Sequence, residues 1–402
     1  MSLILFWSAV LLIVYIFLLF PALTILRGLL FYKPFQQADI TPNVSIVIAA
    51  YNEEKNIRAR IENILSLDYP KEKIEVLIAS DGSTDETDEM VSQYGEKNIR
   101  LLSLSRQGKY AALNAAIPAT TGEILVFSDA NSIYAPNAIR ALVCNFADLN
   151  IGGVAGNQTY LTDTGNRKSG IGERSYWNFD QAQKEFQSRA GSVTSATGSI
   201  YAIRRSLYQP VPAGIADDFF ISTGVIAQGY RLVYAADAIS YEPVAESSKL
   251  EFVRKVRYIM QGLYGVWARR ALLNPFRYGL YAIQLFSHKA LRRWAVFPFL
   301  IFFLASPFLW NQGSFYQAVT LAQAGFFSLS FTGWLLEKTN LGRIKIFSLP
   351  FFFCVIYTAS LVATLKLLSG SRIYIWETQR QTSASASAAL QTTPERKLQN
   401  DV

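Results

Sequence analysis

The chain has 402 residues, enough for one or two domains, and 51% of them are hydrophobic, including 27 Phe and 21 Tyr. Its formal net charge is +8, but basic residues flank apolar runs and do not interleave with aromatic ones, so nucleic acid is not an expected partner. Two distant cysteines, Cys144 and Cys354, exclude a disulfide framework and a cysteine metal motif.

The first element expected in the chain is a membrane anchor. Residues 3–26 form a nearly unbroken apolar run, long enough for a bilayer core about 30 Å thick. The run has no basic segment before it and no small-residue cleavage site, so we expect an uncleaved anchor over residues 1–32. Arg27 and Lys33 follow the run, and the positive-inside rule then places the next region in the cytoplasm.

A soluble domain is expected over residues 33–273, where β-type apolar runs alternate with helical patterns. The alternation predicts right-handed βαβ units, hence an α/β fold whose sheet carries helices on both faces. After about residue 150 the pattern becomes polar and aromatic, which predicts a second half with mixed strands for a second substrate. Strands are predicted at 44–50, 74–80, 123–128 and 198–205, and helices at 54–66, 84–94 and 109–117.

Carboxylates recur where a strand or a turn leads into a helix. Asp81 follows the run IEVLIAS, Asp129 follows EILVFS, and Asp218 lies in GIADDFF. Ligands of open α/β sheets bind outside the carboxyl ends of the strands, so these three side chains are predicted to face a ligand.

Each of these positions also has a structural explanation. Asp81 and Asp85 could cap a helix that begins near Thr84, and the acidic pair at 217 and 218 could start a helix beside its positive dipole. Lys109 could be a solvated charge. Their order along one inferred sheet edge favours the functional reading of the set.

The C-terminal third is expected to meet the membrane. Residues 274–293 mix aromatic and basic residues without enough apolar length to span, which predicts an interfacial amphipathic segment, with His288 in an interfacial role. Residues 294–368 contain apolar runs at about 294–310, 315–336 and 347–368, which predict about three transmembrane helices. The polar tail, 369–402, is predicted to be disordered.

Taken in order, the motifs resemble those of family 2 inverting glycosyltransferases with the GT-A fold, over about residues 42–260. The matching stretches are VSIVIAAYNEE (44–54), SDGSTDET (80–87), SRQGKYAALNAAI (105–117), DAN (129–131), GSIYAIRR (198–205) and DDF (217–219). The apolar flanks resemble those of the family's polysaccharide synthases and lipid-linked sugar transferases. The resemblance implies a Rossmann-like mixed sheet, a nucleotide-sugar donor, with a UDP-sugar favoured, and a lipid or glycan acceptor.

The resemblance also implies roles for individual residues. Asp218 is the implied general base, with Asp217 beside it. Gly198, Ser199 and Arg254 are implied on the acceptor side. The implied nucleotide-sugar residues are Ala50, Glu53, Asp81, Lys109, Asn114, Asp129 and Arg257.

The implied cofactor is Mg²⁺ or Mn²⁺, held by Asp129 and Asn131. A departing diphosphate must be neutralised, and a hard cation held by one or two carboxylates and phosphate oxygens does this. Asn131 stands where the family more often has a carboxylate, which allows a weaker or different metal preference.

Inversion needs one base that takes the acceptor proton while the hydroxyl attacks from the opposite face, so a single carboxylate suffices. Asp218 has the family's spacing to the GYR turn at Gly229. Asp217 is expected to tune Asp218, because adjacent like charges raise a carboxyl pKa.

The segment 254–258 bears on whether sugars are added once or repeatedly, and the acidic residues bear on other functions. Processive relatives carry Q-x-x-R-W where this chain has Arg254, Lys255, Val256, Arg257 and Tyr258, so repeated and single sugar addition both stay open. A transporter is disfavoured, because the apolar runs hold no acidic residue, and a non-catalytic assembly partner is disfavoured by the retained acids. We expect an integral protein of the cell (inner) membrane with a cytoplasmic catalytic domain.

Overall fold

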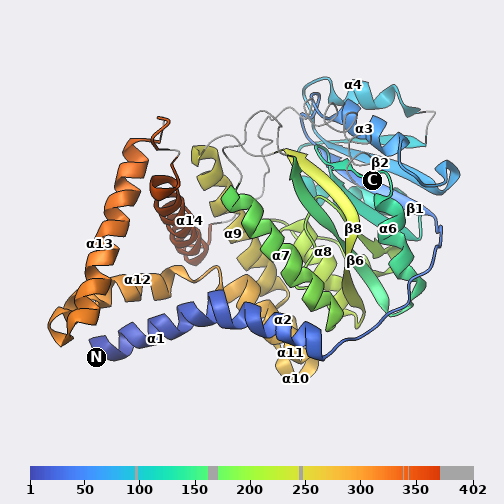
Figure 1. Ribbon diagram of the computed structural model, residues 1–402. Helices are drawn as coiled ribbons and strands as arrows, with labels where there is room; N and C mark the ends of the chain where they lie inside the picture. The colour runs from blue at the N-terminus through green and yellow to red at the C-terminus, as the bar shows by residue number, and fades with distance from the viewer. Residues whose placement is uncertain (96–97, 162–170, 244–247, 338, 343, 372–402) are drawn as a thin grey trace, which may run out of the picture. The chain divides into compact units, whose positions relative to one another are not determined.

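The computed structural model describes residues 1–95, 98–161, 171–243, 248–337, 339–342 and 344–371 (Figure 1). The chain divides into two compact units, one built from Met1–Leu23 with Ser247–Arg372 and the other from Thr24–Glu246. The tail that the sequence predicts to be disordered lies outside the described residues from 372 onward.

The unit Thr24–Glu246 is organised around one eight-stranded sheet with the strand order β3-β2-β1-β4-β7-β6-β8-β5. The first four strands in this order pair in parallel, and β7 then runs antiparallel between β4 and β6. The predicted mixed α/β sheet is confirmed. The strands are β1 Val44–Ala50, β2 Ile74–Asp81, β3 Ile99–Leu104, β4 Ile124–Asp129, β5 Ile133–Tyr134, β6 Ile151–Leu161, β7 Tyr201–Arg204 and β8 Arg231–Pro243.

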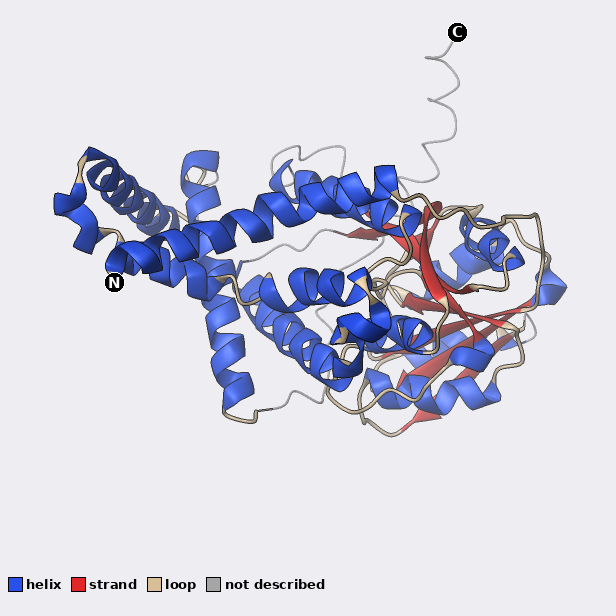
Figure 2. Cartoon of the chain, turned by 90° about the horizontal axis from the view of Figure 1, so that it is seen from below, coloured by secondary structure: helices blue, strands red, loops and turns tan. Residues whose placement is uncertain are grey.

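Helices connect these strands and cover the sheet. All seven residues of β1 are buried, so both faces of the central strand are covered, as parallel strands require. Figure 2 shows the strands grouped as one twisted sheet among the helices. The α-helices between the strands of this unit are α3 Ile57–Leu65, α4 Thr87–Ser92, α5 Lys109–Ala116, α6 Ala138–Val143, α7 Ile171–Arg189 and α8 Asp217–Ala227.

The predicted strands at 44–50, 74–80 and 123–128 match β1, β2 and β4 closely, whereas β3, β6 and β8 were not predicted. The sequence of β6, IGGVAGNQTYL, is rich in glycine and polar residues, which are depleted in strands. Packing explains the glycines, because a Cβ on Gly152 would lie 2.6 Å from a Leu207 methyl and from Tyr230 Cβ. Neighbouring segments approach too closely for a side chain there.

The N-terminal helix is continuous from Ser2 to Leu30, over 29 residues. It comprises α1 Ser2–Val14, a π-helical segment at Tyr15–Leu19, and α2 Phe20–Leu30. Pro21 has no backbone N–H to continue the α-helical ladder, and the π-helical segment ends two residues before it, at Leu19.

Among the described residues, two helices are long and apolar enough to cross a membrane: Ser2–Leu30 and α14, Lys345–Leu368. The apolar run predicted at about 294–310 does not form one long helix. Its α12, Val296–Ala305, has 10 residues and a length of about 15 Å, and a tighter 3-10 turn at Pro307–Gln312 follows it. Proline cannot continue the helical ladder, so the run breaks there.

The helix α13, Ser314–Leu335, has the length of a membrane span with 22 residues. Its Ser, Thr and Gln side chains make it less apolar than the other two helices. Length and composition therefore support one of the about three predicted C-terminal spans.

The segment predicted to be interfacial contains α10 Pro275–Tyr278, α11 Leu280–Leu285 and a π-helical segment at Phe286–Leu291. Its apolar residues divide between two faces. Phe276 is 99% exposed and Leu280 and Ile283 are exposed, whereas Ala282 and Leu285 are buried.

Candidate active site

The loops that follow β1 and β2 are tied together by hydrogen bonds. The backbone N–H of Thr84 donates to Asn52 Oδ1 at 2.8 Å, and the N–H of Asn52 donates to Ser83 Oγ at 3.2 Å. Asn52 itself has a φ of +52°, which asparagine tolerates better than most residues. The YNEE and DGST motifs therefore form one structure at the carboxyl edge of the sheet.

Asp81, at the end of β2, is only 1% exposed, and its carboxylate binds the loop before α5. The Gln107 N–H donates to Oδ1 at 2.7 Å, the Gly108 N–H lies 2.9 and 3.0 Å from the two oxygens, and Arg106 Nη1 donates to Oδ2 at 2.9 Å. Asp81 is thus an anchor for residues 106–108 and does not cap α4.

The close approach of these two loops depends on Gly82. Its φ is +70°, and a Cβ there would lie 2.8 Å from the backbone nitrogen of Arg106. The Arg106 guanidinium in turn lies over the Tyr51 ring, 3.1 Å from its centroid. Sequence reasoning missed Arg106, although its position directly before the glycine-lysine stretch was a usable signal.

Asp85 has the structural role that the sequence allowed. Its Oδ1 accepts the N–H of Thr87 at 3.1 Å and the Thr87 hydroxyl at 2.6 Å, at the start of α4. Its Oδ2 accepts the N–H of Glu54 at 3.2 Å. Asp85 therefore closes the turn just before α4, whose N-cap position is Glu86, and supports the first loop.

The centre of the site is an ion-pair cluster formed by Lys109, Asp129 and Asp217. The Lys109 ammonium lies 2.7 Å from Asp129 Oδ1 and 3.2 Å from Asp217 Oδ2. The three side chains are 20%, 34% and 15% exposed, so the cluster is accessible yet partly desolvated. Burial alone would lower the pKa of Lys109, but the two carboxylates outweigh it and raise that pKa above its ordinary value.

Different elements supply the three charges. Asp129 is the last residue of β4, Lys109 is the first residue of α5, and Asp217 is the first residue of α8. The fold therefore brings together charges that are spread from residue 109 to residue 217 of the sequence, at the edge where ligands of such sheets bind.

Gly198 and Ser199 lie beside this cluster. A Cβ on Gly198 would lie 3.4 Å from Asp129 Oδ2 and 3.8 Å from Lys109 Nζ, which leaves the carboxylate uncovered on that side. Ser199 Oγ is buried and has no hydrogen-bond partner among the described residues.

Asp218 lies next to the cluster, in the first turn of α8. Its Oδ1 accepts the N–H of Phe219 at 2.7 Å. Both acids of the pair therefore sit at a helix N-terminus, where the dipole favours negative charge, and the direct contact with Lys109 is made by Asp217.

Glu53 is a buried carboxyl near the cluster, 7% exposed, and it accepts a hydrogen bond from Asn56 Nδ2 at 2.7 Å. Burial raises the pKa of Glu53 to about 7, against the lowering effect of the Asn56 hydrogen bond, and the nearby negative charges of Asp129 and Asp85 raise it further. Ala50, at the end of β1, is fully buried, so only its backbone could contact a ligand.

The Asn114 amide is directed to the segment 208–211. Its Oδ1 accepts the Tyr208 hydroxyl at 2.7 Å and the Val211 N–H at 2.8 Å, and its Nδ2 donates to the Val211 carbonyl at 2.9 Å. The nucleotide role implied for Asn114 stays a prediction.

Arg254 and Arg257 lie on α9, Ser248–Ala268, in the unit that also holds α12 to α14. A separation of three residues places them on the same side of the helix. Their implied roles toward the donor and the acceptor stay predictions.

Asp129 and Asn131 offer a limited set of metal ligands. No group of three or more His, Cys, Asp or Glu side chains that could hold a metal is found in the described part of the chain. Mg²⁺ usually needs only one or two carboxylates when substrate phosphates complete its shell. The 34% exposed carboxylate of Asp129 and the partly exposed Asn131 fit such a cation.

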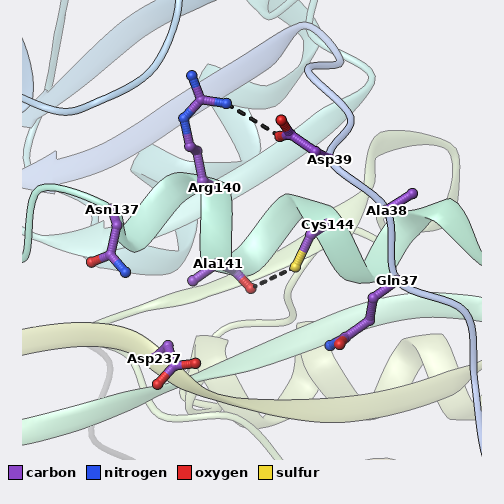
Figure 3. A pocket seen from close by; sticks show the side chains of 8 residues that line it. All are labelled: Gln37, Ala38, Asp39, Asn137, Arg140, Ala141, Cys144 and Asp237. Carbon is purple, nitrogen blue, oxygen red and sulfur yellow. Dashed lines mark hydrogen bonds and ion pairs between the residues drawn. The ribbon is translucent and has the colours of Figure 1, made fainter.

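The hollow drawn in Figure 3 lies along α6 and contains none of the predicted site residues. The ion pair between Arg140 and Asp39, 3.2 Å long, crosses part of it. Its lining is Gln37, Ala38, Asp39, Asn137, Arg140, Ala141, Cys144 and Asp237.

Known proteins resemble this chain in sequence over a little more than half of its length. A 241-residue stretch is 25% identical to a probable glycosyltransferase, YdaM, of Bacillus subtilis (strain 168), covering 56% of each chain. A 240-residue stretch is 28% identical to the poly-beta-1,6-N-acetyl-D-glucosamine synthase of Staphylococcus aureus (strain COL), covering 57% of each. The match thus spans a little over half the length of these curated relatives.

The fold resembles that of a solved mannosyltransferase, PcManGT from Pyrobaculum calidifontis, determined in complex with GDP-Man and Mn²⁺. The TM-score is 0.67 at 24% identity, and the match covers 90% of this chain and 99% of the other. The sheet and its helices are consistent with the GT-A fold.

The family model for glycosyl transferase family 2 matches residues 45–211. This range includes both linked loops, the Asp81 anchor, Lys109 and Asp129. The resemblance inferred from the motifs is therefore confirmed, and the chain contains a glycosyl transferase family 2 domain.

Proposed function

We propose that the chain is a membrane-bound inverting glycosyltransferase that moves a sugar from a nucleotide diphosphate to a membrane-associated polysaccharide or glycolipid acceptor. The observation that carries this proposal is the cluster in which Lys109 joins Asp129 and Asp217 at 2.7 and 3.2 Å. A cation beside carboxylates at the sheet edge suits a donor diphosphate, whose leaving group gains charge as the glycosidic bond breaks.

The loops after β1 and β2 are proposed to bind the nucleotide. Glu53 and the backbone of Ala50 border this region, and Asp81 shapes it through residues 106–108. The solved mannosyltransferase is bound to GDP-Man, and one curated relative makes poly-beta-1,6-N-acetyl-D-glucosamine. We propose a UDP-sugar as the first donor to test and a GDP-sugar as the second.

Asp129 and Asn131 are proposed to hold a divalent cation, as expected from the Mn²⁺ of the solved relative. Bound Mg²⁺ or Mn²⁺ would supply Lewis-acid neutralisation of the diphosphate. Lys109 orients the Asp129 carboxylate and adds a second positive charge on the donor side. Asn131 would provide an uncharged oxygen ligand, so a metal would be held less tightly there than by two carboxylates.

Asp218 is proposed as the general base that removes the proton of the acceptor hydroxyl. Asp217 is engaged with Lys109, so we assign proton transfer to its neighbour and charge organisation to Asp217. Gly198, which leaves space beside Asp129, and Ser199 are proposed to lie on the acceptor side. Arg257 is proposed to contact the diphosphate with its guanidinium fork, and Arg254 to lie on the acceptor side.

The proposed membrane attachment uses Ser2–Leu30 and α14, the two helices with sufficient length and apolar character. The exposed Phe276, Leu280 and Ile283 are proposed to enter the interfacial layer of the bilayer. The basic residues next to the apolar runs support a cytoplasmic position for the catalytic unit.

A cysteine at the exposed position Arg58, in a chain with Cys144 and Cys354 replaced by Ser, tests this orientation. An impermeant maleimide should label Arg58→Cys only after the cells are permeabilised. Labelling of intact cells would place the catalytic unit on the outer side.

The enzymatic proposal is tested with the purified full-length chain, a panel of UDP- and GDP-sugars, and Mg²⁺ or Mn²⁺. Release of UDP or GDP that depends on added lipid or glycan acceptor is expected, and NMR of the product should show an inverted anomeric centre. Asp129→Ala is the matched control. A wild-type chain that releases no nucleotide from any donor would favour a non-catalytic assembly partner.

A further inference from the structure

Arg60 is the largest of the fully buried side chains, with 0% exposure. It lies on α3 and shares a buried face with Ile57, Ile61 and Ile64, whereas Arg58 on the same helix is exposed. A guanidinium in such an apolar face is costly, since the removed hydration must be replaced by contacts inside the protein. The contacts of Arg60 therefore indicate why a charge is placed there.

These contacts all lead to the segment that carries Asp129. The Arg60 Nη2 donates to Ser128 Oγ at 2.9 Å, and the Ser128 hydroxyl donates to the Asp129 carbonyl at 3.0 Å. The guanidinium also lies over the Tyr134 ring, 3.9 Å from its centroid. Arg60 thus touches both ends of the segment 128–134.

Asn63 completes the attachment at the far end of this segment. Its Oδ1 accepts Arg60 Nη1 at 2.7 Å and the Tyr134 N–H at 2.8 Å, and its Nδ2 donates to the Tyr134 carbonyl at 2.9 Å. Arg60 therefore fixes the orientation of the amide that holds the Tyr134 backbone. Residues of α3 therefore hold the turn with Asp129 and Asn131 at both ends, through Ser128 and through Tyr134.

The positive charge of Arg60 interacts with the negative charge of Asp129. Burial lowers the pKa of Arg60, and the Asp129 carboxylate acts in the opposite direction. The two terminal nitrogens of Arg60 donate to Asn63 and Ser128, whereas its Nε has no hydrogen-bond partner among the described residues.

We propose that Arg60 is a positioning residue, which holds the Asp129–Asn131 turn in the geometry that receives the donor diphosphate and offsets the Asp129 charge from below. The proposal deepens the proposed glycosyltransferase function and rests on it for the identity of the ligand. Asn131 makes this support more important, because only one carboxylate of the turn is available to orient a cation or diphosphate.

The test compares four variants of the full-length chain: Arg60→Met, Arg60→Lys, Ser128→Ala and the exposed control Arg58→Met. Hydrogen exchange of the ligand-free chain is followed by mass spectrometry in peptides from 128–134 and from β2. Binding of UDP and of GDP with Mn²⁺ is measured by calorimetry, and the unfolding temperature is recorded.

We expect exchange in 128–134 to rise about 10-fold in Arg60→Met and Ser128→Ala, with exchange in β2 unchanged. The same two variants should bind the nucleotide about 10-fold more weakly, the effect of one lost charge-assisted hydrogen bond. Arg60→Lys keeps the positive charge but loses the two-pronged guanidinium, so its exchange rate and nucleotide affinity should lie between those of Arg60→Met and the wild type. Arg58→Met should behave as wild type.

Unchanged exchange in 128–134, or an equal rise in 128–134 and in β2, would overturn the positioning role. If Arg60→Met does not fold, Ser128→Ala decides, because it removes the hydroxyl that relays Arg60 to Asp129 and leaves the guanidinium in place. A wild-type chain that binds neither UDP nor GDP would contradict the proposed function and leave the exchange result to decide on Arg60.

Discussion

Asp81 and Asp129 end β2 and β4, the two strands on either side of β1, yet their surroundings are opposite in character. Asp81 is 1% exposed and surrounded by Arg106 and two backbone N–H groups. Asp129 is 34% exposed and shares a single ammonium, Lys109, with Asp217. Two carboxylates at equivalent strand ends therefore differ in their exposure and in their hydrogen-bond partners.

The difference teaches that a carboxylate at a strand end can act on a ligand in two ways. A buried carboxylate that receives several donors acts indirectly, since it fixes the loop that meets the ligand. A carboxylate that is partly exposed can contact the ligand or its metal itself. Asp81 is expected to contribute mainly to stability and loop geometry, and Asp129 mainly to chemistry.

The largest effect is expected for Asp129→Ala, which removes the proposed metal ligand and one partner of Lys109. Sugar transfer should fall below detection with or without added Mn²⁺, with little change in the unfolding temperature. Asn131→Asp is the complementary variant and should keep activity at lower Mn²⁺ concentration. Full wild-type activity in EDTA would remove the metal from this account.

Asp218→Asn extends the comparison to α8 and should reduce kcat by roughly 10² to 10⁴-fold, the usual contribution of general-base catalysis. UDP or GDP binding should survive, because the base acts on the acceptor. Asp217→Asn is the matched control. If Asp217→Asn loses kcat to this extent and Asp218→Asn does not, the two acids have exchanged roles.

Arg257→Lys should lose about 10-fold in activity, because lysine cannot reproduce the two-pronged contact of a guanidinium with a diphosphate. Arg254→Lys should lose less, and vesicle binding should be unchanged in both. Equal small losses that added anionic lipid restores would assign the pair to the membrane surface.

Asp81→Asn should sharpen the contrast with Asp129. Its amide would face the N–H donors of Arg106, Gln107 or Gly108, and breaking a buried pair costs about 3 kcal/mol or more. Denaturant unfolding should show this loss. Below the unfolding temperature, kcat should fall much less than in Asp129→Ala; a comparable loss of kcat in a stable Asp81→Asn would show direct participation.

Glu53→Gln should produce the smallest effect, visible as a change in the pH dependence of stability. The folded pKa of about 7 exceeds the ordinary value of 4.5, so the folded state holds its proton longer than the unfolded state. Stability from this group is complete below the ordinary pKa and is lost as pH rises toward 7, at most about 1.4 kcal/mol per pH unit.

Glu53→Gln removes this titration, so its free energy of unfolding should change less between those pH values than that of the wild type. Denaturant unfolding at several pH values measures the two slopes. Equal slopes in wild type and variant would show that folding does not raise the pKa of Glu53.

The amino-acid sequence by itself determined the family and three of the four parallel strands, β1, β2 and β4, but not β3. The β-branched runs of β1, β2 and β4 are buried on both faces, so their local composition reflects their environment. The motifs around Asp81, Lys109 and Asp129 are local in sequence, and the family match over 45–211 contains them.

Only the tertiary structure decided how these residues are partnered. Strand β6 was missed because glycines such as Gly152 are required by close packing against Leu207 and Tyr230, which belong to other segments. Lys109 meets Asp217, and Arg60 reaches Ser128, across separations that no local pattern encodes. Burial and charge pairing arise when distant segments pack together, and they separate the anchoring role of Asp81 from the exposed position of Asp129.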